Sequence, residues 1–188
     1  MTKKQRLIVG IAGSSGPQFG VRLLQVLREI DQVEVHLVMS RGSERSLELE
    51  MGTTLEEVES LADVVYKQGD LAAAISSGSF LTSGMVIAPC SMRTLGALAS
   101  GVTGDLLSRA GDVCLKEGRR LVLVPRETPL NLIHIRNMET MLLAGAVIMP
   151  PVPAFYHRPK SIDDLLDHTV GKILDQFGIP HDLFRRWQ

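Results

Sequence analysis

Two short segments of the chain carry polar residues at places where ligands commonly bind. Arg126 and Glu127 follow the apolar run 121–124, and Tyr156 lies in a proline-rich loop after the apolar run 146–149. Short apolar runs of this kind are typical of buried strands, and open parallel sheets bind ligands outside the carboxyl ends of their strands. An arginine and a phenol at neighbouring strand ends predict a phosphorylated and partly apolar substrate.

A loop rich in glycine and serine follows the first apolar run, which spans 7–12. Gly13 and Gly16 allow a sharp turn and a close approach to a ligand. Ser14 and Ser15 add hydroxyl donors, and the free N–H groups of a following helix would favour an anion. An ordinary strand-to-helix turn is equally consistent with this spacing, because the loop is neither a Walker loop nor a complete Gly-x-Gly-x-x-Gly motif.

A second loop of this kind follows the apolar run 85–88. The sequence predicts Ser91 as a helix N-cap, with Arg93 and Thr94 in the first helical turn. This arrangement repeats the anion-binding geometry of the first loop, so a phosphate and a ring system could lie between the two loops. Cys90 is predicted to be a packing residue, because no histidine lies near it in the sequence to activate its thiol.

Several charged residues have a structural interpretation from the sequence alone. Arg109 could pair with Asp105 one turn earlier on a helix, and Lys116 lies near the C-terminus of that helix, where a cation is favoured. Glu50 belongs to an acidic group that predicts a solvated face, although its place near Gly52 would let its side chain turn inward. The five histidines show no metal-ligand spacing, so no structural zinc site is expected.

Composition predicts one globular domain that binds neither nucleic acid nor a membrane. The chain has 188 residues, of which 45% are hydrophobic and 22% are charged, as is ordinary for a soluble domain. A formal net charge of −1 provides no field that would attract nucleic acid or an anionic membrane. The sequence has two cysteines, no signal peptide and no apolar run of about 20 residues, and it therefore predicts a cytoplasmic protein.

Strand and helix signals alternate along the chain. Continuous apolar runs separated by helical spacing are typical of a parallel sheet covered on both faces, so we expect a single doubly wound, Rossmann-like α/β domain over residues 1–188. Residues 41–80 are the least regular and are expected to hold a loop or insertion, with a short helix opened by a capping box at Thr54. The residues from His181 onward are expected to fray unless they dock on something. The predicted strands are 7–12, 33–39, 85–88, 121–124 and 146–149, and the predicted helices lie near 19–27, 104–117, 130–144 and 161–177.

The candidate residues fall into a series of short motifs that extends along nearly the whole chain. These motifs are Gly13-Ser14-Ser15-Gly16, Ser40 with Glu50, Pro89–Leu95, Arg109 with Lys116, Pro125–Leu130 and Pro153–Pro159. In type, spacing and order they resemble the motifs of the UbiX-like flavin prenyltransferases, formerly described as aromatic-acid or 3-octaprenyl-4-hydroxybenzoate decarboxylases. The resemblance runs from about Leu7 to Trp187. Its most specific parts are the Pro-Arg-Glu-Thr-Pro-Leu and Pro-Ala-Phe-Tyr motifs.

The resemblance implies a flavoprotein-type domain with a defined reaction. Members of the family join a dimethylallyl group from dimethylallyl phosphate to N5 and C6 of reduced FMN, without a metal. The prenylated FMN is then used by a UbiD-type decarboxylase. Members form homododecamers whose sites lie where subunits meet, so the tail at about 179–188 is expected to dock at a subunit interface.

The resemblance also implies roles for individual residues. Catalytic roles fall to a set of polar and charged residues: Ser15, Glu50, Arg109, Lys116 and Glu127. FMN would be bound by residues of the strand-end loops: Gly13, Ser14, Ser15, Ser40, Ser91, Met92, Arg93, Thr94 and Arg126. The prenyl phosphate would contact Tyr156 and Lys172, with Trp187 close to the site. No residue is expected to bind a metal.

Two positions depart from the pattern of the family. Leu71 falls where some relatives carry a tryptophan, so the prenyl pocket would have one aromatic wall fewer. Lys172 replaces an arginine that contacts the phosphate in close relatives, which keeps the charge and loses the bidentate fork. The sequence therefore leaves open whether the donor is a monophosphate or a diphosphate.

Two other functions compete with this interpretation. An FMN-dependent decarboxylase of the phosphopantothenoylcysteine type would be expected to carry a catalytic histidine after the early helix and a Pro-x-Met-Asn clamp. His36 instead falls inside a predicted strand, and the clamp is missing. The third possibility is a non-catalytic flavin-binding subunit. Such a subunit would not require the charged set of Glu50, Arg109, Lys116, Arg126 and Glu127.

Overall fold

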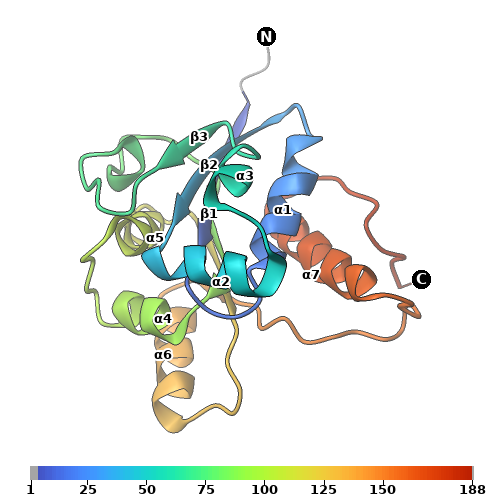
Figure 1. The fold of residues 1–188 in the computed structure, drawn as a ribbon. Coiled ribbons are helices and arrows are strands. Elements are labelled where there is room, and N and C mark those ends of the chain that lie inside the picture. The colour runs from blue at the N-terminus through green and yellow to red at the C-terminus, as the bar shows by residue number, and fades with distance from the viewer. Residues whose placement is uncertain (1–3, 188) are drawn as a thin grey trace.

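A six-stranded parallel sheet forms the centre of the protein (Figure 1). The structure is a computed structural model that describes residues 4–187. The strands are β1 (Gln5–Ile11), β2 (Val33–Met39), β3 (Val64–Tyr66), β4 (Gly84–Cys90), β5 (Arg120–Pro125) and β6 (Val147–Ile148). Their order in the sheet is β3-β2-β1-β4-β5-β6, and every neighbouring pair is parallel. The predicted doubly wound α/β fold is confirmed.

The strand order reverses direction at the middle of the sheet. The chain runs outward from β1 through β2 to β3, returns to the centre at β4, and then runs outward on the other side to β6. The loops that follow β1 and β4 therefore leave neighbouring strands in opposite directions. In open α/β sheets this reversal leaves a crevice at the carboxyl ends of the strands, where ligands bind.

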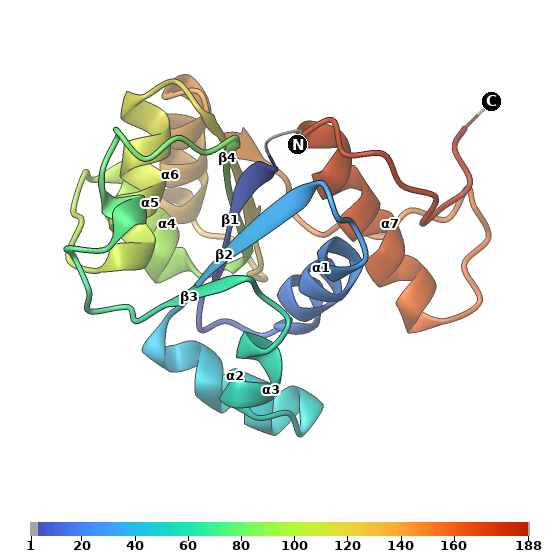
Figure 2. The same ribbon diagram turned by 90° about the horizontal axis from the view of Figure 1, so that it is seen from above.

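Helices cover both faces of the sheet (Figure 2). One face is covered by α4 (Met92–Ala99), α5 (Leu106–Lys116) and α6 (Leu132–Leu143), and the other by α1 (Gln18–Arg28) and α7 (Ile162–Gln176). Two further helices, α2 (Arg41–Met51) and α3 (Leu55–Glu59), connect β2 to β3 and pack through Leu47 and Val58 into the core beside α1. None of the helices within residues 4–187 is long and apolar enough to cross a membrane.

Burial on both faces explains why the strands read as continuous apolar runs. Leu7, Val9 and Ile11 of β1 belong to the core on the side of α1 and α7. Ile8 of the same strand belongs to the core on the side of α4 and α5. Alternate side chains of a strand point to opposite faces, so each position of a doubly covered strand must be apolar.

The structure corrects the prediction for residues 41–80. This region contains the predicted short helix at Thr54, but it also contains α2, the edge strand β3 and a short 3-10 helix at Ala74–Ser76. Helix α2 buries only Ser43 and Leu47, so it lacks the repeating apolar stripe on which helix prediction depends. Strand β3 has three residues, too few for a recognisable alternation.

The carbonyl end of β4 lies directly against α1 at Gly20. A Cβ atom at Gly20 would overlap the carbonyl oxygen of Ala88 and would lie 2.8 Å from Cγ1 of Ile11. We predict that Gly20→Ala lowers the free energy of unfolding by about 1–3 kcal/mol, because the added methyl group overpacks this contact. The loss should occur although alanine is the better helix former.

Thermal unfolding at a fixed protein concentration measures this effect. Gly69→Ala is the matched control, because a Cβ atom at Gly69 meets nothing within 4 Å. Its stability should lie within about 0.5 kcal/mol of the parent. Equal melting temperatures for the two variants would contradict the close contact between α1 and β4.

Candidate active site

The ends of four neighbouring strands are joined by backbone hydrogen bonds. The Ser40 N–H donates to the carbonyl of Ile11 at 2.9 Å, and the Ala12 N–H donates to the carbonyl of Pro89 at 3.1 Å. Between β4 and β5, the Arg126 N–H donates to the carbonyl of Cys90 at 3.3 Å. These bonds hold the loops after β1, β2, β4 and β5 at one edge of the sheet, as the sequence predicts.

Two glycines allow the loop after β1 to touch the start of α2. A Cβ atom at Gly13 would lie 2.6 Å from the Cα of Gly42, so only glycine fits there. Beside this contact, the Ser14 hydroxyl is buried and has no hydrogen-bond partner among the described residues. Ser40 is the N-cap of α2, and its side chain makes no capping hydrogen bond. Two hydroxyl groups are therefore available at the start of α2.

A cavity of about 290 Å³ lies at this edge of the sheet. The residues that line it come from the loops after β1, β2, β3 and β4, from α4 and from the start of α5: Gly13, Ser40, Gly42, Gln68, Ser91, Arg93, Thr94, Ala97, Val102, Gly104, Asp105 and Ser108. Five of them, Gly13, Ser40, Ser91, Arg93 and Thr94, were predicted from the sequence as site residues. Polar groups from several strand ends therefore share one cavity, the usual arrangement of a ligand site in this class of fold.

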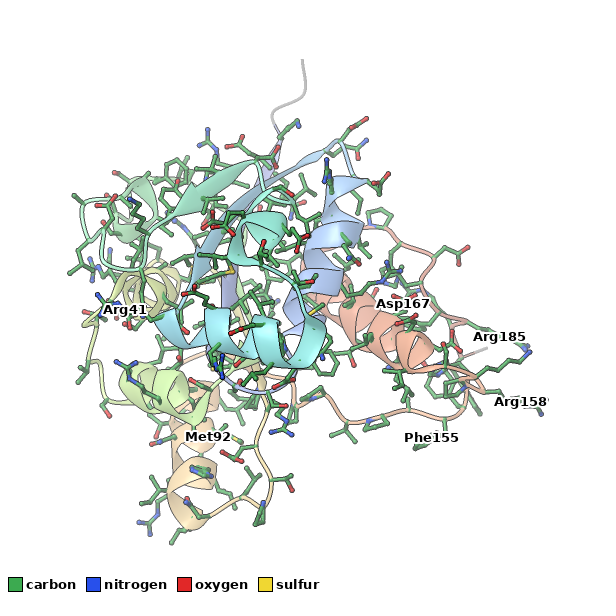
Figure 3. The ribbon with its side chains drawn as sticks, viewed as in Figure 1. Arg41, Met92, Phe155, Arg158, Asp167 and Arg185 are labelled. Carbon is green, nitrogen blue, oxygen red and sulfur yellow. The ribbon has the colours of Figure 1, made fainter. Side chains whose placement is uncertain are left out.

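Local capping fixes the shape of the loop after β4. The Ser91 hydroxyl accepts a hydrogen bond from the Thr94 N–H at 3.2 Å and lies 3.0 Å from the Thr94 hydroxyl. Ser91 is thus the N-cap of α4, as predicted, and Met92 and Arg93 begin the helix. Figure 3 shows Arg41 and Met92, the first residues of α2 and α4.

Gln68 and Asp105 are polar residues of the cavity wall that were not among the predicted site residues. The Gln68 side chain accepts from the Arg41 N–H at 2.8 Å and donates to Oδ2 of Asp105 at 2.9 Å. Asp105 caps α5 by accepting from the N–H and hydroxyl of Ser108. Arg109 instead binds Asp112 at 2.7 Å, so the predicted pairing of Arg109 with Asp105 is wrong. The spacing of Asp105 and Ser108 was a readable capping signal.

Glu50 reaches back from the end of α2 to the loop after β1. Its Oε2 atom accepts hydrogen bonds from the Ser15 hydroxyl at 3.1 Å and from the Gly16 N–H at 2.9 Å. Glu50 is exposed, as the prediction of a solvated acidic face requires, and its side chain also turns back to the loop, as its place near Gly52 allows. Glu48 is exposed as well, and its only ion pair among the described residues is with Arg45 on the surface. The structure thus joins Ser15 and Glu50 across 35 residues of sequence.

The other charged residues that were predicted for the site do not form one group in the structure. Arg126 follows β5, and its Cγ lies 3.8 Å from the position of a Cβ atom at Gly16. Glu127 is exposed and accepts from the N–H of Thr128. Arg109 and Lys116 lie on α5, on the face of the sheet opposite to α7 (Figure 2). Lys116 is paired there with Glu117, and Arg109 with Asp112.

Tyr156 belongs to an aromatic cluster on the side of α7. Its hydroxyl oxygen lies 3.1 Å from Nε2 of His168, and the ring of Trp187 packs edge-on at a centroid distance of 5.6 Å. The rings of His157 and His168 are stacked at 5.0 Å. Burial, with smaller effects of His157 and Lys172, lowers the pKa of His168. Of the predicted substrate residues, Tyr156 and Trp187 are thus in contact.

Comparisons with known proteins identify the family. Residues 1–174 match the family model described as Flavoprotein. The chain is 58% identical over 186 residues to the flavin prenyltransferase UbiX of Escherichia coli (strain K12), covering 98% of each chain. It is 53% identical over 182 residues to a probable UbiX-like flavin prenyltransferase of Streptomyces sp. (strain D7), covering 97% of this chain and 91% of the relative. The chain belongs to the UbiX flavin prenyltransferases.

Solved structures of the family have the same fold. The crystal structure of AnUbiX (PadA1) in complex with FMN and dimethylallyl pyrophosphate matches with a TM-score of 0.97 and 49% identity, covering 99% of this chain and 98% of that one. A dodecameric FMN-dependent UbiX-like decarboxylase from Escherichia coli O157:H7 matches with a TM-score of 0.96 and 50% identity, covering 98% and 100%. The peptidyl-cysteine decarboxylase EpiD, at 16% identity and a TM-score of 0.62, shares the fold alone.

The C-terminal tail of this UbiX family member is docked on its own α7. Asp175 binds Arg186 through both carboxylate oxygens, at 3.1 and 2.7 Å, and its Oδ1 lies 3.1 Å from Nε2 of the buried His181. These hydrogen bonds, above all that from Arg186, lower the pKa of Asp175 to about 2. Lys172 approaches the same carboxylate at 3.6 Å. Asp175 therefore holds both the tail and a predicted substrate residue.

We predict that Asp175→Asn loosens the tail without unfolding the protein, because Arg186 and His181 lose their anionic partner. Trp187 is the only tryptophan of the chain, so its fluorescence anisotropy reports the motion of the tail directly. The anisotropy should fall in this variant. Asp182→Asn is the control, since Asp182 is an exposed tail carboxylate without an ion pair among the described residues. An unchanged anisotropy in both variants would show that Asp175 does not hold the tail.

The same contact predicts a dependence of stability on pH. The pKa of Asp175 is about 2 in the folded protein, against about 3.9 for aspartate in an unfolded chain. A depressed folded pKa gives a stabilisation that is complete above the unfolded value and is lost as the pH falls through the folded value. The stability difference between the parent and Asp175→Asn should therefore be constant above about pH 4 and shrink toward pH 2. A difference that grows on acidification would contradict this prediction.

Proposed function

We propose that the chain is a flavin prenyltransferase, which joins the dimethylallyl group of dimethylallyl phosphate to N5 and C6 of reduced FMN. The product is prenylated FMN for a UbiD-type decarboxylase. The observation that carries the proposal is the Ser15–Glu50 pair at the loop after β1, whose Gly13 lines the polar cavity at the strand ends. Flavin binding alone does not require a carboxylate in that place, whereas removal of a proton from the flavin ring needs a base, which Glu50 or the released phosphate can supply.

The phosphate of FMN fits the region where the loop after β1 meets α2. The buried Ser14 hydroxyl has no partner among the described residues, and an anion would supply one. The start of α1 likewise has no side-chain cap at Pro17, so its N–H groups favour an anion. We assign FMN binding to Gly13, Ser14, Ser15, Ser40, Ser91, Met92, Arg93, Thr94 and Arg126.

The prenyl phosphate is assigned to Tyr156 and Lys172, with Trp187 closing the site. Arg109, Lys116 and Glu127 are assigned to the same reaction as charged groups around the leaving phosphate. Helices α5 and α7 cover opposite faces of the sheet, so the cations of α5 would meet Tyr156 only through neighbouring chains (Figure 2). We therefore propose a homododecamer whose sites lie between subunits. The description of a UbiX-like relative as dodecameric supports this assembly.

The residues suit an ionising allylic donor. Cations and hydroxyl donors stabilise the negative charge that develops on the departing phosphate. The flavin ring, when bound, offers a π surface against which an allylic cation is stabilised. Glu50 can then accept or relay the proton that is lost as C6 is alkylated, with Ser15 orienting its carboxylate. No group of three or more potential metal ligands is assembled within residues 4–187, and no step is assigned to a metal.

The competing functions have less support. A decarboxylase of the phosphopantothenoylcysteine type would need a catalytic histidine after the early helix, and His36 is instead buried within β2, 2.8 Å from Glu34 and 2.9 Å from Tyr66. A flavin-binding subunit without activity would need no proton acceptor at Glu50. The cytoplasmic location, the single flavin-binding domain over 1–188 and the docking of the tail at a subunit interface stay predictions.

Anaerobic incubation tests the function directly. The protein is mixed with reduced FMN and dimethylallyl phosphate, and the extracted flavin is analysed by mass spectrometry. The expected result is a gain of one five-carbon prenyl unit. A parallel incubation with the diphosphate donor addresses the donor preference that Lys172 and the exposed Leu71 leave open. FMN that stays unmodified with both donors would favour the binding subunit.

We predict opposite effects of Ser14→Ala on stability and on flavin binding. Removing a buried hydroxyl without a partner should leave the stability of the flavin-free protein unchanged or raise it by about 1 kcal/mol. The affinity for FMN should fall about tenfold, since a hydrogen bond to a charged phosphate is lost. Flavin fluorescence titration measures the affinity. An unchanged affinity would place the phosphate elsewhere.

We predict that Glu50→Gln and Ser15→Ala stop the reaction after the first bond. Each variant should slow ring closure by about 10²- to 10⁴-fold, because a positioned proton acceptor is removed or misdirected. A flavin alkylated at N5 alone should accumulate and be visible in time-resolved absorbance and mass spectra. Glu48→Gln, on the same helix, should close the ring at the parent rate. Closure at the parent rate in Glu50→Gln would refute the role of the pair.

A further inference from the structure

The hydroxyl of Tyr156 has a second possible partner besides the prenyl phosphate. Its oxygen lies 3.1 Å from Nε2 of His168, on α7. A phenol has one hydrogen to donate, so a Tyr156 hydroxyl that donates to His168 cannot donate to a phosphate. The protonation of Nε2 on His168 therefore decides which partner receives the hydrogen of Tyr156.

His168 is held in place from several sides. The ring of His157, from the loop before α7, stacks on it with an interplanar angle of 7°. The ring of Phe184, from the C-terminal tail, packs at 4.7 Å on another side. Tyr156 itself lies edge-on at 5.6 Å. Contacts from two separate segments fix the ring plane, so Nε2 stays directed at the Tyr156 hydroxyl.

The surroundings of His168 also favour its neutral form. Burial is the largest cause of its lowered pKa, and the electrostatic effects of His157 and Lys172 act in the same direction. A neutral imidazole carries a hydrogen on one ring nitrogen only, and the other nitrogen can only accept. The two tautomers of His168 therefore have opposite effects on Tyr156.

We propose that His168 is a positioning residue for prenyl transfer: its Nε2–H donates to the oxygen of Tyr156 and leaves the hydroxyl hydrogen of Tyr156 for the prenyl phosphate. The inference rests on the proposed function, since it deepens the role assigned to Tyr156. A phenol that accepts one hydrogen bond becomes a stronger donor in the next, so the pair binds a phosphate better than Tyr156 alone. His168 itself does not touch the substrate.

Calorimetric titration tests the proposal without turnover. Dimethylallyl phosphate is titrated into the protein loaded with oxidised FMN, so that no prenylation takes place. His168→Leu should weaken binding about tenfold, because the Tyr156 hydroxyl loses the donor that orients it toward the phosphate and strengthens its own hydrogen bond. His168→Gln keeps an N–H donor and should bind within about threefold of the parent. The affinity for FMN should be unchanged in both variants, and their melting temperatures show whether they fold.

The same substitutions in a Tyr156→Phe background separate positioning from general packing. If His168 acts through the Tyr156 hydroxyl, His168→Leu should cause no further loss in that background. An equal loss in both backgrounds, or a His168→Gln variant as weak as His168→Leu, would overturn the proposal. A parent protein that fails to bind dimethylallyl phosphate would overturn it as well. Failure of the proposed function would give a different result. Dimethylallyl phosphate would still bind in the titration, but the prenylation assay would yield unmodified FMN.

Discussion

The contact between Gly13 and Gly42 is the constraint on which the rest of the candidate site depends. Two backbone segments touch there without side chains between them, so the loop after β1 and the start of α2 form one wall of the cavity. The other end of α2 returns to the same loop, where Glu50 binds Ser15 and Gly16. Helix α2 is thus fixed at both ends to one loop, which sets the distance between the phosphate region and the proposed proton acceptor.

The layered fold divides the functional residues into groups. The carboxyl edge of the sheet holds the residues assigned to FMN, α5 holds Arg109 and Lys116, and the side of α7 holds Tyr156 and Lys172. Arg158 and Arg185 lie at the edge of the molecule beyond α7, and Phe155 lies below that helix in the same view (Figure 3). Assembly of several chains would unite these groups and would also cover apolar side chains such as the exposed Leu143 of α6. The proposed reaction and the proposed dodecamer therefore depend on each other.

Much of the fold and part of the site could be predicted because their signals are local. The apolar run of β1, the loop that follows it, and Ser91 with Thr94 three residues later are each readable within a few residues. The direction of the Glu50 side chain could not be predicted from periodicity, because it depends on Ser15, 35 residues away. Gln68 is likewise placed by partners on α2 and α5. The ion pair between Asp175 and Arg186, which holds the tail, depends on tertiary folding in the same way.

A crystal structure of the FMN complex would locate the phosphate. We expect a phosphate oxygen to accept a hydrogen bond from the Ser14 hydroxyl, within reach of Ser40 and the start of α1. The Ser15–Glu50 hydrogen bond should persist beside the flavin ring. A phosphate bound instead in the neighbouring cavity of about 610 Å³, which Glu44 and Glu59 line, would contradict the account. So would a Ser14 hydroxyl that remains without a partner in the complex.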